Sequence, residues 1–263
     1  MAISDKDKVR EYWDSRAELG PEAGTQDLIA RELEIRAIEQ FIRDGMTILD
    51  AGCGNGTTAI ELAERHSVKV IGIDFSSKMI TSASKLAEKS AEDGKLSGCV
   101  DFFCRDITCE VWGPSYFDLV YTQRAIINLP DWETQKATIE LLGTYLKPGG
   151  KYLMCECSQD GLDAINRLRK KVGLSDIIPP WHNHYLHEMN LHSFGEPFKN
   201  MTLLWEDNFS STYYFLSRVV NAWLAKQEGK EPDYNSPVNQ LALRLPPFFG
   251  NFGQVKLWVW TRI

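Results

Sequence analysis

The chain lacks any long apolar run. None of its 263 residues belongs to an uninterrupted apolar segment near the roughly 20 residues that a helix needs to cross a bilayer. The first residues, MAISDKDKVREYW, are polar and lack the apolar core of a secretory signal peptide. We therefore expect a cytoplasmic protein with no membrane span.

Positive charge is also scarce. Lysine and arginine total 29 against 36 aspartates and glutamates, which gives a formal net charge of -7. Such a surface repels a phosphate backbone, so we do not expect the chain to bind nucleic acid. The one dense basic run, residues 167–171, lies toward the end of a predicted helix, where cations complement the helix dipole.

The six cysteines include no CxxC pair, and most stand in apolar or strand-like context, at Cys99, Cys104, Cys155 and Cys157. That distribution is typical of reduced thiols in a packed interior. We predict no disulfide and no metal site.

Strand-like and helical patterns alternate from residue 46 to residue 157, and alternation of this kind predicts a parallel sheet covered on both faces. The predicted strands are 46–50, 68–73, 100–104, 117–122 and 151–157, and the predicted helices are 57–65, 76–91 and 131–146.

The pattern loosens after residue 158. A helix is predicted over 160–172, followed by a stretch rich in Pro, Trp and His, and two last strands over 201–209 and 254–262. The intervening residues 210–250 contain an aromatic helix, and so long an excursion inside a sheet indicates a functional cap. The fold class is thus α/β, a Rossmann-like seven-stranded and mostly parallel sheet with a C-terminal cap insertion.

A glycine-rich loop, Ala51-Gly52-Cys53-Gly54-Asn55-Gly56, follows the first predicted strand and precedes the first predicted helix, with Asp50 within the strand. Glycines let the backbone approach a ligand, and a helix N-terminus offers unpaired N–H groups to an anion. The spacing reads GxGxG, whereas a dinucleotide fingerprint reads GxGxxG.

Acidic residues end the next two strands. Asp74, within Gly72-Ile73-Asp74-Phe75-Ser76, ends the second strand, where a carboxylate can accept both hydroxyls of a ribose. Asp106 follows the third strand, placed to meet the amino group of an adenine while Ile107 covers one face of the ring.

Taken together, ILDAGCGNG, GIDFS, CRDIT, FDLVYTQ and YLKPGGKYL resemble the class I S-adenosylmethionine-dependent methyltransferases over about residues 30–158. The resemblance implies that S-adenosylmethionine is the cofactor and S-adenosylhomocysteine the product. It also implies a set of cofactor contacts: Gly52 and Gly54 near the methionine part, Asp74 near the ribose, Asp106 and Ile107 near the adenine, and Gln123 near the sulfonium. Asp50 and Phe75 are further candidates for cofactor binding.

We interpret residues 1–263 as a single methyltransferase domain. Its expected parts are an N-terminal lid (1–30), a cofactor-binding core (31–158), an acceptor cap (159–200 and 210–250) and the last two strands (201–209 and 254–262). In the lid, Trp13 would face the sulfonium by a cation–π contact and Arg16 would reach the carboxylate of the cofactor. A solvent-exposed amphipathic helix with one aromatic anchor is the alternative reading of this segment.

Four of the five histidines lie between residues 182 and 192. Transfer to an alcohol requires a base near the acceptor, so His182 and His184 are the candidate catalytic residues. A hydrated loop with incidental histidines is the alternative. A zinc site is disfavoured because HExxxH places its histidines five residues apart, whereas HExxH places them four apart on one helix face.

Arg124 follows the fourth strand and could hold an anionic acceptor, or serve only in a cap or salt bridge. Trp181 and Tyr214 are candidate substrate contacts, since aromatic faces suit sugars and other apolar surfaces. QRAIINLPDWETQ with PPWHN is similar to bacterial methyltransferases of glycan, lipopolysaccharide and secondary-metabolite clusters.

These features predict methylation of a small-molecule hydroxyl, on a sugar or a sugar-containing metabolite. N-methylation of an amino sugar or amine stays open, as does a non-catalytic cofactor-binding scaffold. Homodimerisation through the aromatic excursion is a further alternative.

Overall fold

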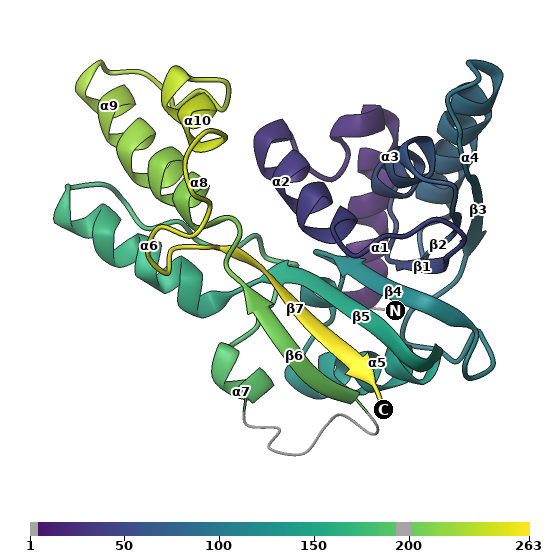
Figure 1. Ribbon diagram of the computed structural model, residues 1–263. Coiled ribbons are helices and arrows are strands. Elements are labelled where there is room, and N and C mark those ends of the chain that lie inside the picture. Colours follow the sequence, from purple (N-terminus) through teal and green to yellow (C-terminus); the bar gives the residue numbers. More distant parts are fainter. Residues whose placement is uncertain (1–4, 193–200) are drawn as a thin grey trace.

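The computed structural model describes residues 5–192 and 201–263, and a seven-stranded sheet runs through it (Figure 1). The strand order is β3-β2-β1-β4-β5-β7-β6. The first five strands pair in parallel, and β7 runs antiparallel to both of its neighbours. The strands are β1 Thr47–Ala51, β2 Lys69–Asp74, β3 Cys99–Cys104, β4 Phe117–Gln123, β5 Leu146–Cys157, β6 Met201–Asp207 and β7 Val255–Arg262.

This sheet confirms the predicted Rossmann-like α/β fold. The strands β1, β2 and β4 are buried along almost their whole length, as expected for strands covered on both faces. The largest boundary difference is at β5, which begins at Leu146 instead of residue 151, because Leu146 already pairs with Phe117 of β4.

The three helices predicted in the core and the one predicted directly after it are present. They are α3 Thr57–Arg65, α4 Ser77–Glu92, α5 Trp132–Thr144 and α6 Gln159–Lys171. Side-chain oxygens of Ser76, Asp131 and Ser158 cap the N-termini of α4, α5 and α6 by accepting backbone N–H groups. In Figure 1, α3 and α4 lie on one side of the sheet and α5 on the other.

The N-terminal region forms α1 Asp5–Arg16, a 3-10 segment Ala17–Glu22 and α2 Leu28–Glu39. The helix α2, which the sequence analysis did not predict, begins at the N-cap Asp27, whose side chain accepts the Ala30 N–H. Figure 1 shows α2 on the same side of the sheet as α3, and α1 contacts α4.

The C-terminal segments form a cap of short helices: α7 Glu188–His192, α8 Ser211–Phe215, the π-helical segment η3 Leu216–Asn221, α9 Ala222–Gln227 and α10 Pro237–Ala242. From α8 through α9 the chain is continuously helical, which matches the predicted aromatic helix. Residues 193–200 of the predicted cap and residues 1–4 of the predicted lid lie outside the described residues.

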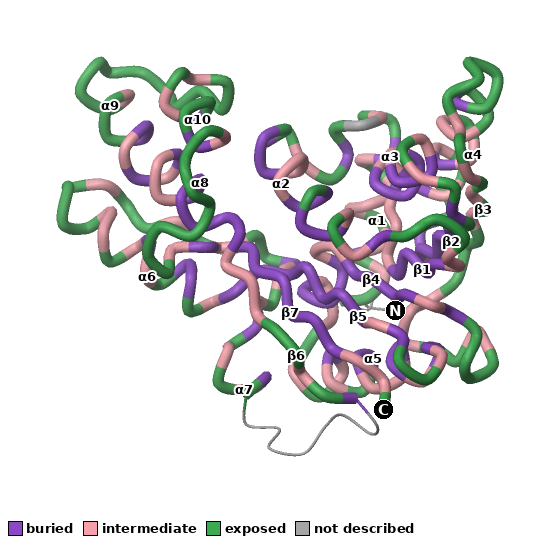
Figure 2. The backbone as a smooth tube through the Cα atoms, viewed as in Figure 1, coloured by how far each residue is buried: buried purple, intermediate pink, exposed green. Residues whose placement is uncertain are grey.

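The cap and the sheet share one hydrophobic core. Tyr213, Tyr214, Val219 and Ala242 of the cap are buried in the same cluster as the sheet residues (Figure 2). Full burial of a large apolar side chain contributes roughly 1.5–3 kcal/mol. The cap therefore packs as an integral part of the fold.

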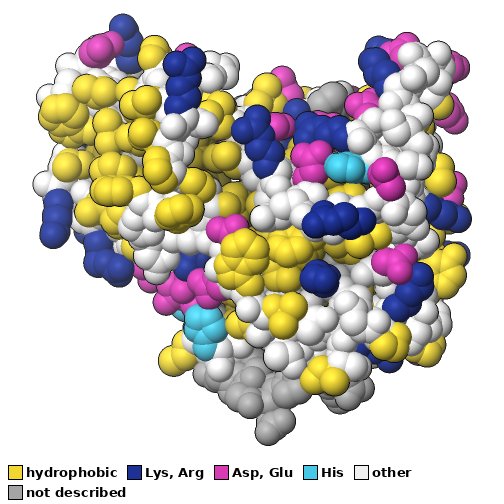
Figure 3. Space-filling model, viewed as in Figure 1, with side chains coloured by type: hydrophobic (Ala, Val, Ile, Leu, Met, Phe, Trp, Pro, Cys, Tyr) yellow, Lys and Arg dark blue, Asp and Glu magenta, His cyan; other side chains and the backbone are white. Residues whose placement is uncertain are grey.

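The outer face of the cap is apolar in part. Figure 3 shows hydrophobic side chains gathered over α8–α10, and exposed large apolar residues there include Trp223, Leu241, Phe248 and Phe249. Homodimerisation through this excursion stays a prediction. Among the described helices, none combines the length and apolar character that a bilayer crossing requires.

Candidate functional site

A cavity of about 930 Å³ lies at the carboxyl ends of the parallel strands, and α1, α2, the strand-end loops and the cap all line it. This volume is near the upper end of the ~300–1,000 Å³ typical of ligand sites. The structure brings every predicted site residue to this one cavity: Trp13, Arg16, Asp50, Gly52, Gly54, Asp74, Phe75, Asp106, Ile107, Gln123, Arg124, Trp181, His182, His184 and Tyr214.

The glycine loop after β1 presents bare backbone to the cavity. Gly52, Gly54 and Gly56 have φ values of 84°, 52° and 75°. A Cβ added to Gly52 would lie 2.4 Å from the Cβ of Ala125, whereas one added to Gly54 would meet no atom within 4 Å. Gly54 thus faces open space, and α3 begins directly after Gly56 without a side-chain cap. Unpaired N–H groups at this point suit an anionic group.

Asp50 lies deeper than the loop. Its Oδ2 accepts a hydrogen bond from the Tyr121 hydroxyl at 2.7 Å, and the carboxylate is 2% exposed. Burial raises the pKa of Asp50 to about 7, against the opposing effect of the Tyr121 hydrogen bond. Asp50 therefore lies at the floor of the cavity as a buried group.

Asp74 ends β2 with both carboxylate oxygens held by backbone. Its Oδ2 accepts the Gly54 N–H at 3.0 Å and its Oδ1 accepts the Ser76 N–H at 2.8 Å. Burial raises the pKa of Asp74 to about 6, while these two N–H groups act in the opposite direction. Since each oxygen keeps a further lone pair, the carboxylate can still accept two hydroxyl groups.

Asp106, at the end of β3, is oriented by Thr108 and Lys6. Its Oδ1 accepts the Thr108 N–H at 2.9 Å and the Thr108 hydroxyl at 2.8 Å, and its Oδ2 forms an ion pair with Lys6. These contacts lower the pKa of Asp106 despite its partial burial. The side chain of Ile107, which is half-buried, lines the same part of the cavity.

Gln123, at the end of β4, connects three elements. Its Nε2 donates to Glu34 Oε2 at 2.6 Å, and its Oε1 accepts the Thr58 hydroxyl at 2.6 Å. Glu34 on α2 is 1% exposed and lies 3.2 Å from Arg124 Nε. Burial raises the pKa of Glu34, and Arg124 opposes that rise. Glu34, which the sequence analysis missed, therefore positions Gln123 at the end of β4 and Arg124 in the turn that follows.

The turn after β4 is strained and is held by a second buried acid. Arg124 has φ 53°, in the left-handed region that non-glycine residues rarely adopt. Glu156 on β5 is fully buried; its Oε1 accepts the N–H groups of Ala125 and Ile126, each at 3.0 Å, and its Oε2 faces the N–H of Ile127 at 3.5 Å. Burial raises the pKa of Glu156 to about 7.

The helix α1 covers one side of the cavity. Trp13 Nε1 donates to Asn128 Oδ1 at 3.2 Å, which ties α1 to the turn after β4. Arg16 Nε donates to the Ala23 carbonyl at 2.6 Å, and its guanidinium lies 5.9 Å from the centroid of the Tyr12 ring. Part of the Arg16 hydrogen-bonding capacity is thus used within the lid, and its contact with a cofactor carboxylate stays a prediction.

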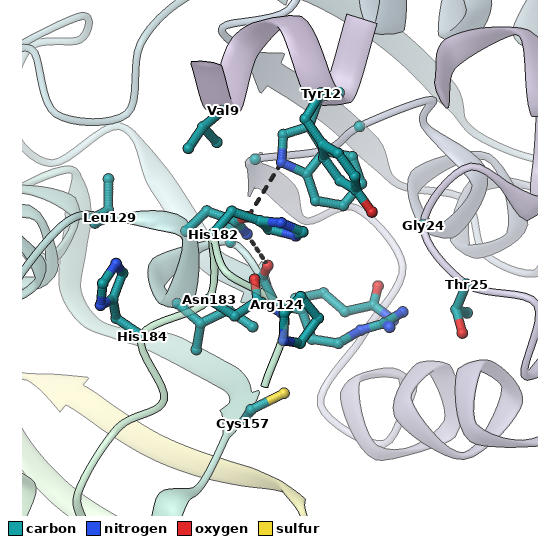
Figure 4. A pocket seen from close by; sticks show the side chains of 18 of the residues that line it. Val9, Tyr12, Gly24, Thr25, Arg124, Leu129, Cys157, His182, Asn183 and His184 are labelled. Carbon is teal, nitrogen blue, oxygen red and sulfur yellow. Dashed lines mark hydrogen bonds between the residues drawn. The ribbon is translucent and has the colours of Figure 1, made fainter. Parts of the chain in front are cut away.

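His182 and His184 differ in environment (Figure 4). His182 is 4% exposed, and its ring lies 4.2 Å from the Tyr12 ring and 5.7 Å from the Trp13 ring, measured between centroids. Its Nδ1 is buried without a hydrogen-bond partner. Burial and the nearby charge of Arg16 lower the pKa of His182, which keeps the ring neutral near pH 7. His184 is exposed, and its backbone N–H donates to the Ile127 carbonyl.

The two aromatic substrate candidates lie at different depths. Trp181 is 59% exposed and stands edge-on to His182, with centroids 5.3 Å apart. Tyr214 is 5% exposed and lines the cavity from the cap.

Another histidine of this segment points away from the cavity: His192 pairs with Glu206 at 2.8 Å. Among the described residues, no group of three or more His, Cys, Asp or Glu side chains could hold a metal ion.

Several residues that shape the cavity carried no motif signal. They are Tyr12, Glu34, Asn128, Glu156 and Arg218. An acid inside an otherwise apolar strand, as at Glu156 in YLMCEC, and one on the apolar face of a helix, as at Glu34, are the signals that could have identified two of them.

The arrangement fits S-adenosylmethionine. The Gly54 backbone borders open space beside an uncapped helix N-terminus, and a carboxylate with spare lone pairs follows at Asp74. Asp106 and Ile107 continue the same wall. These groups are chemically compatible with the carboxylate, ribose and adenine of that cofactor, and the contact of each residue with it stays a prediction.

Comparison with known proteins agrees with this geometry. The sequence profile described as a methyltransferase domain matches residues 42–190. Phosphoethanolamine N-methyltransferase 1 of Arabidopsis thaliana is 33% identical over 52% of this chain and 30% of its own length. The 27-O-demethylrifamycin SV methyltransferase of Amycolatopsis mediterranei is 31% identical over 62% of this chain and 57% of its own length. The chain spans less than two thirds of either relative.

Solved structures share the fold. The magnesium protoporphyrin IX methyltransferase of Synechocystis, solved with bound S-adenosylmethionine, has a TM-score of 0.56 at 16% identity, covering 100% of this chain and 99% of that one. A methyltransferase from Methanosarcina mazei also has a TM-score of 0.56, at 18% identity over 86% of this chain and 97% of that one.

Proposed function

The chain belongs to the class I S-adenosylmethionine-dependent methyltransferases, and on that premise we propose that it methylates a hydroxyl group of a small acceptor, with His182 as general base. The acceptor that we favour is a sugar or a sugar-containing metabolite. The observation that carries the proposal is the buried and unpartnered Nδ1 of His182 in the cavity.

Cofactor binding is assigned to the ends of β1, β2 and β3. We propose that Asp74 accepts the ribose hydroxyls, that Asp106 and Ile107 hold the adenine, and that the backbone at Gly52 and Gly54 holds the methionine part. When bound, S-adenosylmethionine supplies an electrophilic methyl group on a sulfonium. Positioning then provides much of the rate, because the displacement needs no covalent enzyme intermediate.

A neutral histidine can take a proton from an alcohol, and a base held by packing keeps its direction. His182 is packed against Tyr12 and Trp13, which also shield it from water. Near it, Asn183 Oδ1 is likewise buried without a hydrogen-bond partner, and Arg124 Nε, although 3.2 Å from Glu34 Oε2, has no aligned acceptor. A polyhydroxylated acceptor would satisfy such groups, which supports a sugar over an apolar acceptor.

The test is formation of S-adenosylhomocysteine with a panel of sugars, comparing wild type with His182→Gln and His184→Gln. With a hydroxyl acceptor, His182→Gln should lower kcat by roughly 10²–10⁴-fold, the usual contribution of a general base, and should leave cofactor affinity unchanged. His184→Gln is the matched control and should retain most activity.

Amine methylation is the second candidate, favoured by the similarity to a plant phosphoethanolamine N-methyltransferase. A neutral amine needs no strong base. Turnover of amines that survives His182→Gln, together with no transfer to any hydroxyl despite tight cofactor binding, would replace the first proposal with this one.

A further inference from the structure

Arg218 has an unusual position in the cap. It lies on the π-helical segment η3, a rare geometry that often marks functional sites, and its side chain lines the same cavity. The rings of Tyr213, Tyr214 and Tyr234 surround its guanidinium, with centroids 5.9, 5.2 and 4.9 Å from Cζ. The side chain is 18% exposed.

Only part of this guanidinium is used by the protein. Nη2 donates to Asp27 Oδ2 at 2.6 Å and Nη1 donates to Ser217 Oγ at 2.7 Å. A guanidinium has five N–H groups, and the other three have no acceptor among the described residues. Since the side chain borders the cavity, a ligand there can accept from them.

Asp27 neutralises Arg218 only in part. Its Oδ1 already accepts the Ala30 N–H at 3.0 Å and the Tyr213 hydroxyl at 2.6 Å. A second cation lies close, because Arg169 donates to the Arg218 carbonyl and its pKa is lowered by burial and by the Arg218 charge. The Asp27 carboxylate therefore serves three donors at once, and the guanidinium of Arg169, on which Asp176 also acts, adds a second positive charge near Arg218.

A further cation stands on the β4 side of Tyr214. Arg124 lines the cavity, and its Nε is buried with no aligned acceptor although Glu34 lies 3.2 Å away. Tyr214 and Arg218 line the same cavity, with the Tyr214 ring centroid 5.2 Å from Cζ of Arg218. The acceptor end of the cavity therefore concentrates arginines in a chain whose net charge is -7.

We infer that this end of the cavity binds an oxyanion of the acceptor, a carboxylate or a phosphate, through Arg218 with Arg124 as a second cation. The inference rests on the proposed function, since it defines the acceptor class of the same site. Guanidinium groups bind such oxyanions by paired, charge-assisted hydrogen bonds. The tyrosine rings would pack against the apolar part of the same molecule.

Calorimetry tests this without turnover. Inorganic phosphate and benzoate are titrated at constant ionic strength into protein saturated with S-adenosylhomocysteine, which blocks the cofactor's own anion site. Wild type should bind at least one of the two. Arg218→Gln should weaken that binding about tenfold or more, and Arg218→Lys should restore part of it.

Two controls separate ligand binding from cap stability. Arg244→Gln removes an exposed cap arginine outside the cavity and should change nothing. Asp27→Asn removes the internal partner of Arg218 but keeps the cation, so anion binding should persist. An equal loss of anion affinity in Asp27→Asn and Arg218→Gln would show that Arg218 only stabilises the cap, which would overturn the inference. Absence of binding of either anion to wild type would overturn it as well.

The two proposals fail separately. Anion binding that depends on Arg218 in a protein that methylates no hydroxyl would defeat the proposed function alone. Methylation of neutral sugars with no anion binding would defeat the oxyanion site alone.

Discussion

The cofactor side and the acceptor side of the cavity are built in different ways. Most of the cofactor side comes from one stretch, from Asp50 to Ile107, and its carboxylates are already partnered by the protein: Asp50 by Tyr121, Asp74 by backbone N–H groups. Its geometry is thus complete before any ligand arrives.

The acceptor side is assembled from α2, the turn after β4 and the cap. Four of its buried polar atoms have no hydrogen-bond partner, and they belong to Glu34, Arg124, His182 and Asn183. An unpaired buried polar group costs roughly 1–3 kcal/mol. Such groups are tolerated where a ligand pairs with them.

The difference suggests where specificity resides. A preformed cofactor site can be shared among many methyltransferases, whereas an unsatisfied acceptor site selects a molecule that supplies the missing partners. Substitutions on the two sides should therefore have different consequences.

The largest effect is expected on the cofactor side. Asp74→Ala removes a charged acceptor for two ligand hydroxyls, and hydrogen bonds to charged groups contribute about 1.5–3 kcal/mol each. Affinity for S-adenosylhomocysteine, measured by calorimetry, should fall roughly 100-fold or more. Asp101→Ala, an exposed carboxylate on β3 outside the cavity, is the control and should bind normally. Normal binding of S-adenosylhomocysteine by Asp74→Ala would show that the cofactor side does not depend on this carboxylate.

The next effect concerns the acceptor side. Glu156→Ala leaves the N–H groups of Ala125 and Ile126 buried without their acceptor, which should lower the free energy of unfolding by about 3 kcal/mol. Glu156→Gln keeps one acceptor oxygen and should cost less. Urea unfolding measures both. Equal stability of all three proteins would show that the strained turn after β4 does not depend on this carboxylate.

The sequence predicted the fold, and it predicted which strand-end residues would line one cavity, because both follow from local patterns. Strands alternate with helices, and the carboxyl ends of neighbouring parallel strands must meet at one edge, which places Gly54, Asp74 and Asp106 together. The caps at Ser76 and Asp131 are local signals of the same kind.

The acceptor wall was harder to predict for a physical reason. Glu34 and Glu156 are buried acids that break the apolar pattern of α2 and β5, and their partners are about 90 and 30 residues distant in the chain. Arg218 depends on a π-helical turn that no local pattern announces. His182 was identified from histidine density, but its burial against Tyr12 comes from packing between α1 and the cap.

A smaller effect should appear with pH. Because burial raises the pKa of Asp74 to about 6, its carboxylate is ionised at pH 7 and becomes protonated as the pH falls through 6. In the proposed assignment the ionised form accepts both ribose hydroxyls, so cofactor affinity should fall below pH 6, approaching tenfold per pH unit. Titrations between pH 7.5 and pH 5 measure this slope. Asp74→Asn should bind weakly but without the slope, and an unchanged slope in that variant would assign the titration to another group, such as Asp50.

The smallest effect separates backbone strain from ligand contact within the cofactor side. Gly54→Ala places a Cβ in open space at φ 52°, which should cost about 1–2 kcal/mol of stability because alanine disfavours the left-handed region. Gly94→Ala has the same character, with φ 67° and no atom within 4 Å, but lies outside the cavity. Thermal unfolding should therefore show similar losses for both. Only Gly54→Ala should also weaken S-adenosylhomocysteine binding, by about fivefold. If both variants bound the ligand equally well, the glycine loop would serve the turn alone, and the cofactor side would owe its affinity to the strand-end carboxylates.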